Sequence, residues 1–296
     1  MGDRPPRGMA AQERLVTAMR GVAVIRGLHA ATRAARSWVM RRRLVRDLRR
    51  LGVSKGQVLL VHASLSSIGW VEGGAATVVT ALRRAVGRTG TVVVSTGTEE
   101  NSHTSRAHQE RIKHMTDDEI ASYRRDMPAF DKDTTPGTAG AIAEKLRTTG
   151  GAVRSAHPQS SLAAIGPLAG YLMADHRLDC HLGEQSPLRK LYDNDAQILL
   201  LGVGYRSCTA FHLAEYRYTV NPPTQSYSCV VMRNDRRTWE EYIDVVLDDG
   251  DFGTIGKSLD GELPVKKRNV GNAKCRLVSL PAAVDFACTW LSSNRC

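Results

Sequence analysis

The chain has 296 residues, of which 42% are hydrophobic and 24% are charged. These values are ordinary for a globular protein and exclude a disordered or fibrous chain. No run approaches the roughly 18 apolar residues of a membrane span, so we expect no membrane insertion. The six scattered cysteines form no CxxC pair, which argues against a disulfide framework and favours a cytoplasmic protein.

The net charge of +11 is concentrated at one end of the chain. Residues 1–50 contain thirteen arginines, no lysine and three acidic residues, which leaves 28 basic and 27 acidic residues for the remainder. A basic arm can bind polyanions, but no DNA-binding motif or aromatic-interleaved basic surface appears elsewhere. The sequence therefore predicts no nucleic-acid partner. We interpret residues 1–40 as a basic N-terminal extension and 41–296 as one domain.

From residue 41 onward, apolar residues follow helical and strand periods in alternation. Leu44, Leu48 and Leu51 have helical spacing, and Gly52 is suited to end that helix. The pattern then predicts strands at 58–61, 91–94, 162–165, 197–203 and 276–280, and helices at 75–86, 138–147, 167–174, 208–217, 239–246 and 282–291. Residues 97–134 form a long polar excursion, partly helical, of the kind that serves as a lid or binding loop. This alternation predicts a single layered α/β domain.

The segment LGVGYRSCTAFHLAEYR at 201–217 carries the most chemistry. A buried strand stops at glycines, and Thr209, His212 and Glu215 follow at successive i+3 positions, so they share one helical face. Ligands of open α/β sheets bind at the carboxyl ends of strands, where these residues would lie. Histidine titrates near neutrality and suits removal of a proton from an ammonium group. The alternative is that His212 and Glu215 only stabilise the helix.

Two further segments precede or follow buried strands. Pro158 restrains His157 to an extended backbone, which would present it on a loop. In that position His157 could serve in catalysis. The alternative is that it only forms hydrogen bonds with the backbone of its loop. Residues 61–74 form a Ser- and Gly-rich passage from strand to helix, where backbone amides can approach an anion closely. A phosphate- or pantetheine-bearing ligand fits this passage, which has neither a Walker ending nor a GxGxxG fingerprint.

The sequence disfavours two other kinds of site, a metal site and a nucleophilic cysteine or serine. The segment His176–Pro187 holds two histidines, an aspartate and a glutamate, but it lacks an HExxH or cysteine-rich spacing, so we expect no metal. Cys208 precedes His212 by one turn, yet this spacing on one helix aligns sulfur and ring nitrogen poorly. There is also no GxSxG elbow. We therefore assign Cys208 to the core and expect no nucleophilic catalysis.

Together these segments resemble the aminoglycoside 3-N-acetyltransferase family, the antibiotic acetyltransferases outside the GCN5-related fold. The resemblance spans residues 41–295 and rests on segments in one order: VHASLSSIGWVEGGA at 61–75, TPGTAGAIAEKLR at 135–147, RSAHPQSSLAAIG at 154–166, HRLDCHLGEQSPLRKLY at 176–192, ILLLGVG at 198–204, TAFHLAEYR at 209–217, DFGTIG at 251–256 and VGNAKCRLVSL at 270–280. It implies a three-layer α/β/α domain with a mixed central sheet. It also implies acetyl transfer from acetyl-CoA to a primary amine in a ternary complex, without an acyl-enzyme.

The resemblance also implies roles for individual residues. The family's catalytic histidine falls on His212, and its acidic partner falls on Glu215. By analogy Glu184 and His157 line the same region. The CoA-binding side matches the residues Ser64, Leu65, Ser66, Ser67, Gly69, Gly73, Gly74, Arg154 and Ser155. Our hypothesis is that His212 accepts the ammonium proton, that Glu215 stabilises the imidazolium, and that backbone amides or Thr209 stabilise the oxyanion.

The substrate is the least determined property. Polycationic aminoglycosides need an acidic cleft, and the 97–134 excursion mixes acids such as Glu99 and Asp131 with arginines and lysines. We expect these two and Glu184 to bind the substrate, and we expect the acceptor to be the 3-amino group of an aminoglycoside. A non-aminoglycoside amine of secondary metabolism or self-protection is the alternative, and a non-catalytic CoA- or anion-binding protein is a further one. The oligomeric state stays open, with a homodimer among the alternatives.

Overall fold

A computed structural model describes residues 40–295 of the chain. The predicted basic extension, residues 1–40, lies outside the described residues except for Met40. The first described helix occupies residues 40–51 and buries Leu44, Leu48 and Leu51 against the body of the protein. As predicted, it ends at Gly52, whose backbone N–H bonds back to the carbonyl of Leu48.

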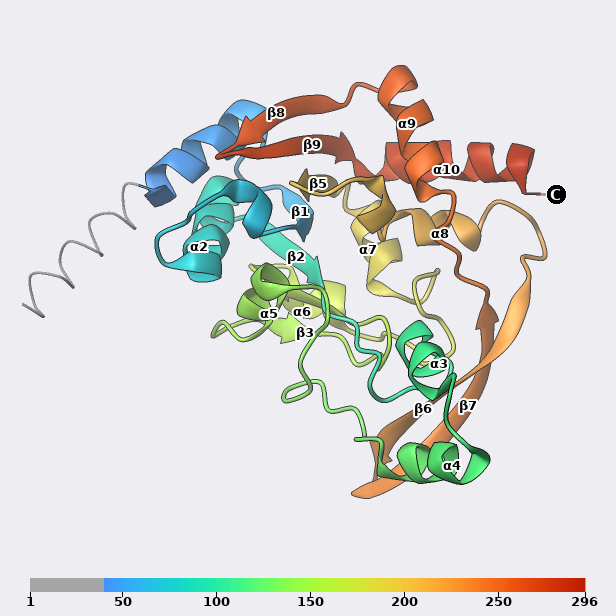
Figure 1. Ribbon diagram of the computed structural model, residues 1–296. Coiled ribbons are helices and arrows are strands. Elements are labelled where there is room, and N and C mark those ends of the chain that lie inside the picture. Colours follow the sequence, from blue (N-terminus) through green and yellow to red (C-terminus); the bar gives the residue numbers. More distant parts are fainter. Residues whose placement is uncertain (1–39, 296) are drawn as a thin grey trace, which may run out of the picture.

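A seven-stranded mixed sheet forms the centre of the molecule, in the order β3-β4-β2-β1-β5-β9-β8 (Figure 1). β1, β2 and β5 are parallel, whereas β4 and β9 run antiparallel to their neighbours β2 and β5. The mixed sheet is thus confirmed. The bounds are β1 Val58–Ala63, β2 Thr91–Ser95, β3 Val153–Arg154, β4 Leu162–Ile165, β5 Gln197–Leu201, β8 Lys266–Val270 and β9 Ala273–Ser279.

Helices cover both faces of this sheet, because the central strands are apolar on both sides. In β1, Leu59 and Val61 join one core cluster and Leu60 joins the other. The first cluster packs under the 40–51 helix, α2 (Gly74–Val86) and α5 (Ala141–Arg147). The second packs under α6 (Ala169–Met173), α7 (Pro187–Asp193), α8 (Phe211–Glu215), α9 (Phe252–Glu262) and α10 (Leu280–Asn294). The predicted α/β/α layering is therefore confirmed.

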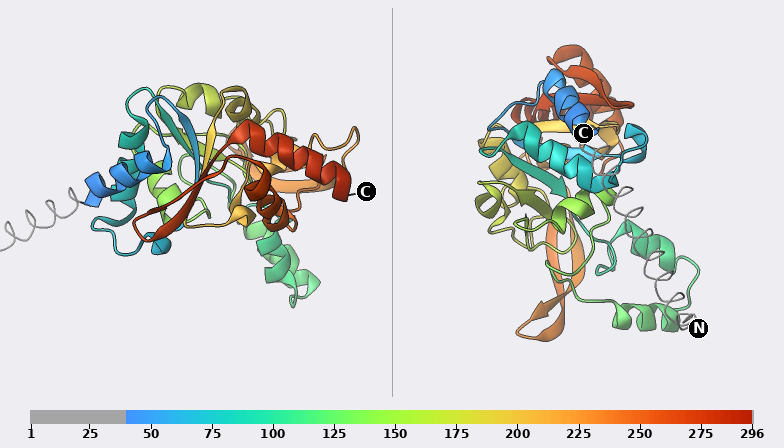
Figure 2. Two further views of the ribbon diagram at one scale, coloured as in Figure 1. Left: turned by 90° about the horizontal axis from the view of Figure 1, so that it is seen from above. Right: turned by 90° about the vertical axis from the view of Figure 1, so that its left-hand side faces the viewer.

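The segment 218–250 departs from the prediction. The expected helix at 239–246 is wrong, because these residues belong to strand β7 (Arg236–Val245), which pairs along its whole length with β6 (Thr224–Arg233). Asn234 and Asp235 both have positive φ, as a two-residue hairpin turn requires. The hairpin projects from the layered body in orange (Figure 2). Its cross-strand pairing overrides the helical spacing read from 239–246.

The polar excursion is partly helical, as predicted. It contains α3 (Arg106–Ile112) and α4 (Asp117–Asp126), and it is fastened to the hairpin by bridges that pair Ser102 with Cys229 and Phe130 with Val231. Two short 3-10 turns, η1 (Ser66–Ile68) and η2 (Tyr205–Ser207), follow β1 and β5. Both turns lie at the edge of the sheet where the parallel strands end.

Candidate active site

The carboxyl ends of β1, β2 and β5 meet at one edge of the sheet. β1 has β2 on one side and β5 on the other, and such a switch point is where open α/β sheets bind ligands. A pocket of about 200 Å³ lies there. Its apolar lining carries four polar side chains: His62, Ser95, Ser207 and Thr209.

The structure brings His212 and Glu215 together on α8. Nδ1 of His212 lies 2.6 Å from Oε2 of Glu215. The neighbours Phe211, Leu213 and Ala214 are fully buried, and they fix α8 in the core. The His212 side chain keeps 16% of its surface exposed, and its ring packs against Phe252 at 4.7 Å. Because Nδ1 is engaged by the carboxylate, Nε2 is the nitrogen that can exchange a proton with a ligand.

The carboxylate of Glu215 is fully buried, and two donors compensate its charge. Its Oε1 accepts hydrogen bonds from the backbone N–H of Asp248 at 2.9 Å and from Arg295 at 2.7 Å. Arg295 also donates to the carboxylate of Asp251 at 2.7 Å. A buried carboxylate without such partners would be strongly destabilising. The donors therefore keep Oε2 directed at His212.

His62 is a candidate functional residue that the sequence analysis missed. It is 8% exposed, it lines the pocket, and its Nε2 has no hydrogen-bond partner among residues 40–295. Burial, and next the charge of His212, lower the pKa of His62 to about 4, so its ring is neutral at pH 7. The available signal was a polar residue inside the otherwise apolar strand Val58–Ala63.

Two hydroxyl groups face each other in the same pocket. Oγ1 of Thr209 and Oγ of Ser95 are 3.1 Å apart and belong to segments 114 residues apart in the chain. Both residues line the pocket. Hydroxyl groups so placed can donate to an oxyanion, and this arrangement adds Ser95 to the expected Thr209.

The predicted CoA-binding loop is tethered to the same edge of the sheet. The backbone N–H of Ser64 donates to Leu201 at the end of β5, and Oγ of Ser67 donates to the carbonyl of Gly202 at 2.9 Å. Gly69 has a φ of 87°, and a Cβ there would lie 2.6 Å from Nδ2 of Asn272. The loop therefore requires glycine where it passes the β8–β9 turn. The remaining predicted positions of the loop are Leu65, Ser66, Gly73 and Gly74.

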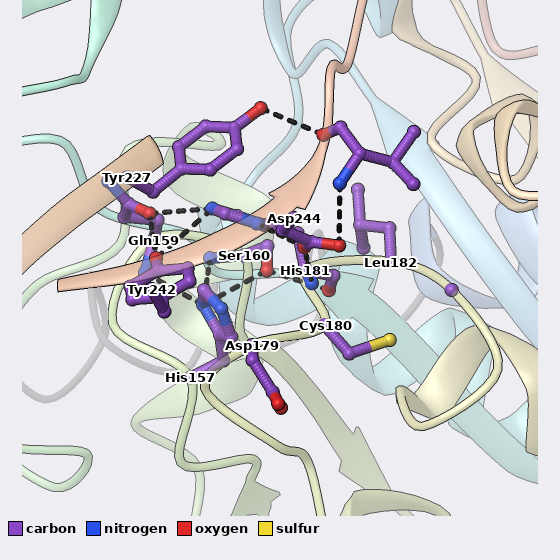
Figure 3. A network of polar contacts seen from close by, with 12 residues as sticks. His157, Gln159, Ser160, Asp179, Cys180, His181, Leu182, Tyr227, Tyr242 and Asp244 are labelled. Atoms are coloured by element: carbon purple, nitrogen blue, oxygen red, sulfur yellow. Dashed lines mark hydrogen bonds and ion pairs between the residues drawn. The ribbon is translucent and has the colours of Figure 1, made fainter. Parts of the chain in front are cut away.

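His157 does not line this pocket. It is fully buried in a separate polar network, part of which Figure 3 shows. Its ring centre lies 4.8 Å from that of His176 and 4.6 Å from that of His181. Nδ1 accepts from the backbone N–H groups of Gln159 and Ser160, and Nε2 donates to a carbonyl. Burial, followed by the neighbouring histidines, lowers the pKa of His157 well below its usual value. This geometry matches the backbone-bonded alternative.

The network of Figure 3 joins three distant segments. Asp244 of β7 lies 2.6 Å from Nδ1 of His181, as Figure 3 shows. Outside the view of that figure, Asp244 also accepts the hydroxyl of Tyr216, the residue that follows α8. Burial opposes the charge on Asp244, but the hydrogen bonds from His181 and Tyr216 outweigh it and hold its pKa below the usual value. The network thus fastens the hairpin to the end of the helix that carries His212.

Arg154 and Ser155 are also engaged inside the protein. The Arg154 guanidinium donates to Oγ of Ser161 at 3.0 Å and to backbone carbonyls, among them that of Thr96. Burial lowers the pKa of Arg154 to about 10. Ser155 is fully buried and bonds to Nδ1 of His176 at 2.9 Å. Neither residue lines the pocket.

The three expected substrate carboxylates are not brought together. Glu184 is held by Arg189 at 2.7 Å and by Arg217 at 2.6 Å. The carboxylate of Asp131 accepts two backbone N–H groups of its own loop. Glu99 is exposed on the excursion. None of the three lines the pocket.

Cys208 is buried in the core, as predicted, and burial raises its pKa to about 12. Within residues 40–295, no three His, Cys, Asp or Glu side chains are grouped so that they could hold a metal ion. In the same range no helix is long and apolar enough to cross a membrane.

Comparison with known proteins identifies the chain. Residues 60–292 match the family model described as aminoglycoside 3-N-acetyltransferase. The chain belongs to this family. The acetyltransferase is 38% identical over 253 residues to the aminoglycoside N(3')-acetyltransferase-like protein YokD of Bacillus subtilis, covering 85% of this chain and 92% of YokD. It is 35% identical to aminoglycoside N(3)-acetyltransferase III of a Salmonella species, covering 86% and 92% of the two chains.

Solved structures support the same assignment. The crystal structure of YokD superposes on 86% of this acetyltransferase and 94% of YokD with a TM-score of 0.81. A structure of AAC-IIIb in binary complex with CoASH superposes with a TM-score of 0.76 at 29% identity, covering 86% and 96% of the two chains. The acetyltransferase is thus an enzyme of known reaction class.

Proposed function

We propose that this acetyltransferase transfers the acetyl group of acetyl-CoA to the 3-amino group of an aminoglycoside. The observation that carries the proposal is the His212–Glu215 pair on α8, which follows Thr209 in the chain. Thr209 lines the pocket at the ends of β1, β2 and β5, and so does His62, whose pKa is lowered by burial and next by the nearby His212. His212 and Glu215 are not themselves among the lining residues. Relatives bear on the two substrates: AAC-IIIb is solved with CoASH and AAC-VIa with sisomicin. The catalytic domain is taken to span residues 41–296. The cysteines among the described residues are all free, which suits the reducing cytoplasm.

His212 would act as the general base. The substrate ammonium first loses a proton to Nε2 of His212, because only the free amine can attack a carbonyl. The nitrogen then bonds to the carbonyl carbon, and the oxyanion accepts hydrogen bonds from Thr209 and Ser95. Collapse of this intermediate breaks the carbon–sulfur bond, and His212 returns its proton to the leaving thiolate. The second nitrogen proton passes to solvent, so the products are the amide, CoA thiol and one proton.

Glu215 would act through His212. Its carboxylate holds Nδ1–H, which fixes the tautomer that leaves Nε2 free to accept a proton. It also stabilises the imidazolium while the proton is held there. The loop from Ser64 to Gly74 would hold acetyl-CoA through backbone N–H groups and hydroxyls near the amino end of α2. Arg154 and Ser155 bond to other groups inside the protein, so we assign them no direct contact with acetyl-CoA.

A thiol-release assay with acetyl-CoA tests the proposal. Wild-type protein is expected to release thiol with gentamicin or sisomicin, and mass spectrometry with NMR would locate one acetyl group on the 3-amino nitrogen. His212→Ala should lower kcat by about 10²–10⁴-fold with little change in CoA affinity. The exposed His114→Ala serves as the matched control. Full activity of His212→Ala would remove His212 from the mechanism.

A second substrate class is favoured by one observation. Glu184 and Asp131 are both engaged within the protein, which leaves fewer carboxylates for a polycation than the sequence indicates. A less strongly charged amine from secondary metabolism would fit such a site. The same assay with monoamines and diamines distinguishes the two classes. If kcat/KM is higher for these amines than for gentamicin, they and not aminoglycosides are the preferred substrates.

A further inference from the structure

A groove lined by arginines lies between the 40–51 helix and α2. This arginine groove has a volume of about 960 Å³ and is lined by Arg42, Arg43, Val45, Arg46, Arg49, Arg50 and Arg84. All six arginines are exposed. Arg83 and Arg88, next to Arg84 in the chain, are exposed as well. The fold therefore adds arginines of α2 to those that the sequence concentrates before residue 51.

Few negative charges offset this surface. Asp47 is the one acidic residue of the 40–51 helix, and residues 74–90 contain none. Asp47 lies 4.0 Å from Arg43 and 3.5 Å from Arg46, and it also accepts the backbone N–H of Gly271. Like charges at i and i+4 on one helix repel each other. Within residues 40–295, Arg49, Arg50 and Arg84 form no ion pair with a carboxylate, so the charge of these three guanidinium groups is not offset there.

The arginine groove is separate from the candidate active site. The two sets of lining residues share no member. Arg84 lies in the last turn of α2, which leads into the start of β2, whereas the active-site pocket lies where β2 ends. Acetyl transfer at His212 therefore leaves this surface without a role.

The chemistry of the arginine groove selects its partner. Each guanidinium is a planar fork that matches the oxygens of a phosphate. A helix that inserts into a lipid surface keeps an apolar face for the membrane. Here that face, formed by Leu44, Leu48 and Leu51, is already buried in the core. The large exposed hydrophobic side chains of the described residues lie elsewhere in the chain, and no aromatic residue lines the arginine groove.

We propose that the arginine groove binds the phosphodiester backbone of a double-stranded nucleic acid, without reading its base sequence. Contacts to phosphates position a duplex and carry no sequence information. The sequence predicts no nucleic-acid partner, because it contains neither a DNA-binding motif nor a basic surface interleaved with aromatic residues. A backbone-only surface needs neither.

Salt dependence of duplex binding by the full chain provides the test. Fluorescence anisotropy would follow 20-base-pair DNA and RNA duplexes of one sequence. If five of the six lining arginines each contact one phosphate, the slope of log K against log salt is about −4.5. This slope corresponds to roughly a 500-fold loss of affinity between 50 and 200 mM NaCl. In the variant Arg46→Gln/Arg50→Gln/Arg84→Gln the slope should become shallower by about 2.7. Unchanged acetyl transfer in this variant would show that it is folded.

A matched triple variant controls for net charge. Arg111, Arg125 and Arg236 are exposed on the polar excursion and the hairpin, away from the arginine groove, and their replacement by Gln removes the same charge. This control should keep the wild-type slope. Equal binding by wild type and the groove variant would overturn the proposal, as would displacement of the duplex by saturating CoA. Tighter binding to phosphatidylserine vesicles than to either duplex would contradict the proposal and identify a membrane surface as the partner. A preference for one duplex would identify its source as DNA or RNA.

Discussion

Arg295, the penultimate residue of the chain, lies 2.7 Å from the buried carboxylate of Glu215. Its guanidinium also contacts Asp251 and the carbonyl of Asp248, so the end of α10 is fastened to the segment that leads into α9. The C-terminal end of the chain thus contributes to the geometry of the His212–Glu215 pair, although Arg295 is 80 residues away from Glu215 in sequence.

Replacing Arg295 is expected to impair catalysis more than binding. In Arg295→Ala the Glu215 carboxylate loses its charged partner and can turn away from His212, so kcat should fall by about 10²-fold while the KM for acetyl-CoA changes little. Arg295→Lys should recover part of the rate, because a cation is restored. Steady-state kinetics measures the split, with Arg233→Ala, which breaks the exposed pair with Glu240, as the control. A parallel rise in KM with constant kcat would contradict the positioning role.

Gly69 is expected to be more sensitive to substitution than Gly74. Both have positive φ, but a Cβ at Gly69 would lie 2.6 Å from Asn272, whereas nothing lies within 4 Å at Gly74. Gly69→Ala should therefore shift the predicted CoA-binding loop and raise the Kd of CoA about tenfold or more, since positive φ and a close contact both penalise alanine. Calorimetric titration with CoA compares the two variants. Equal Kd values would show that this turn does not position CoA.

Replacing Asp248 is expected to change the KM of the amine substrate and to leave the KM of acetyl-CoA unchanged. Its side chain is exposed while its backbone N–H donates to Glu215, so the residue lies next to the proposed catalytic pair. A carboxylate there can attract an incoming ammonium group. Asp248→Asn should raise the KM of a polyamine substrate severalfold at low salt and less at high salt, with kcat nearly unchanged. Asp235→Asn, in the hairpin turn, is the control. An unchanged KM at low salt would exclude Asp248 from substrate binding.

The protein is expected to lose stability in mild acid. Burial is the main cause that lowers the pKa of His62 and of His176 to about 4, and that of His157 well below its usual value. Below pH 6.5 the unfolded chain binds protons at these histidines while the folded chain does not, so the free energy of unfolding falls as pH decreases. For His62 and His176, the loss between pH 6.5 and 5 is about 1.5 kcal/mol each.

Urea unfolding at pH 7, 6 and 5 measures this loss. His176→Gln should lower stability at pH 7 and reduce the pH slope by about one proton. The exposed His114→Gln should leave the slope unchanged. A wild-type free energy of unfolding that stays constant from pH 7 to 5 would refute the lowered pKa values.

The sequence by itself determined the layers of the fold and the pairing of His212 with Glu215 at the centre of the proposed site. Continuous apolar runs such as 58–61 identify strands buried on both faces, and the i+3 spacing places His212 and Glu215 on one side of a helix. These features are local, since they depend on the period of a single element. Local spacing also misled the prediction at 239–246, because β7 is defined by its pairing with β6.

The tertiary structure alone decided which distant groups meet. Ser95 joins Thr209, and Arg295 joins Glu215, across 114 and 80 residues of sequence. His157 is enclosed by His176 and His181 and stays outside the pocket, whereas His62 enters it. Burial and pairing across long separations depend on how whole elements pack, and no spacing within a single segment records them.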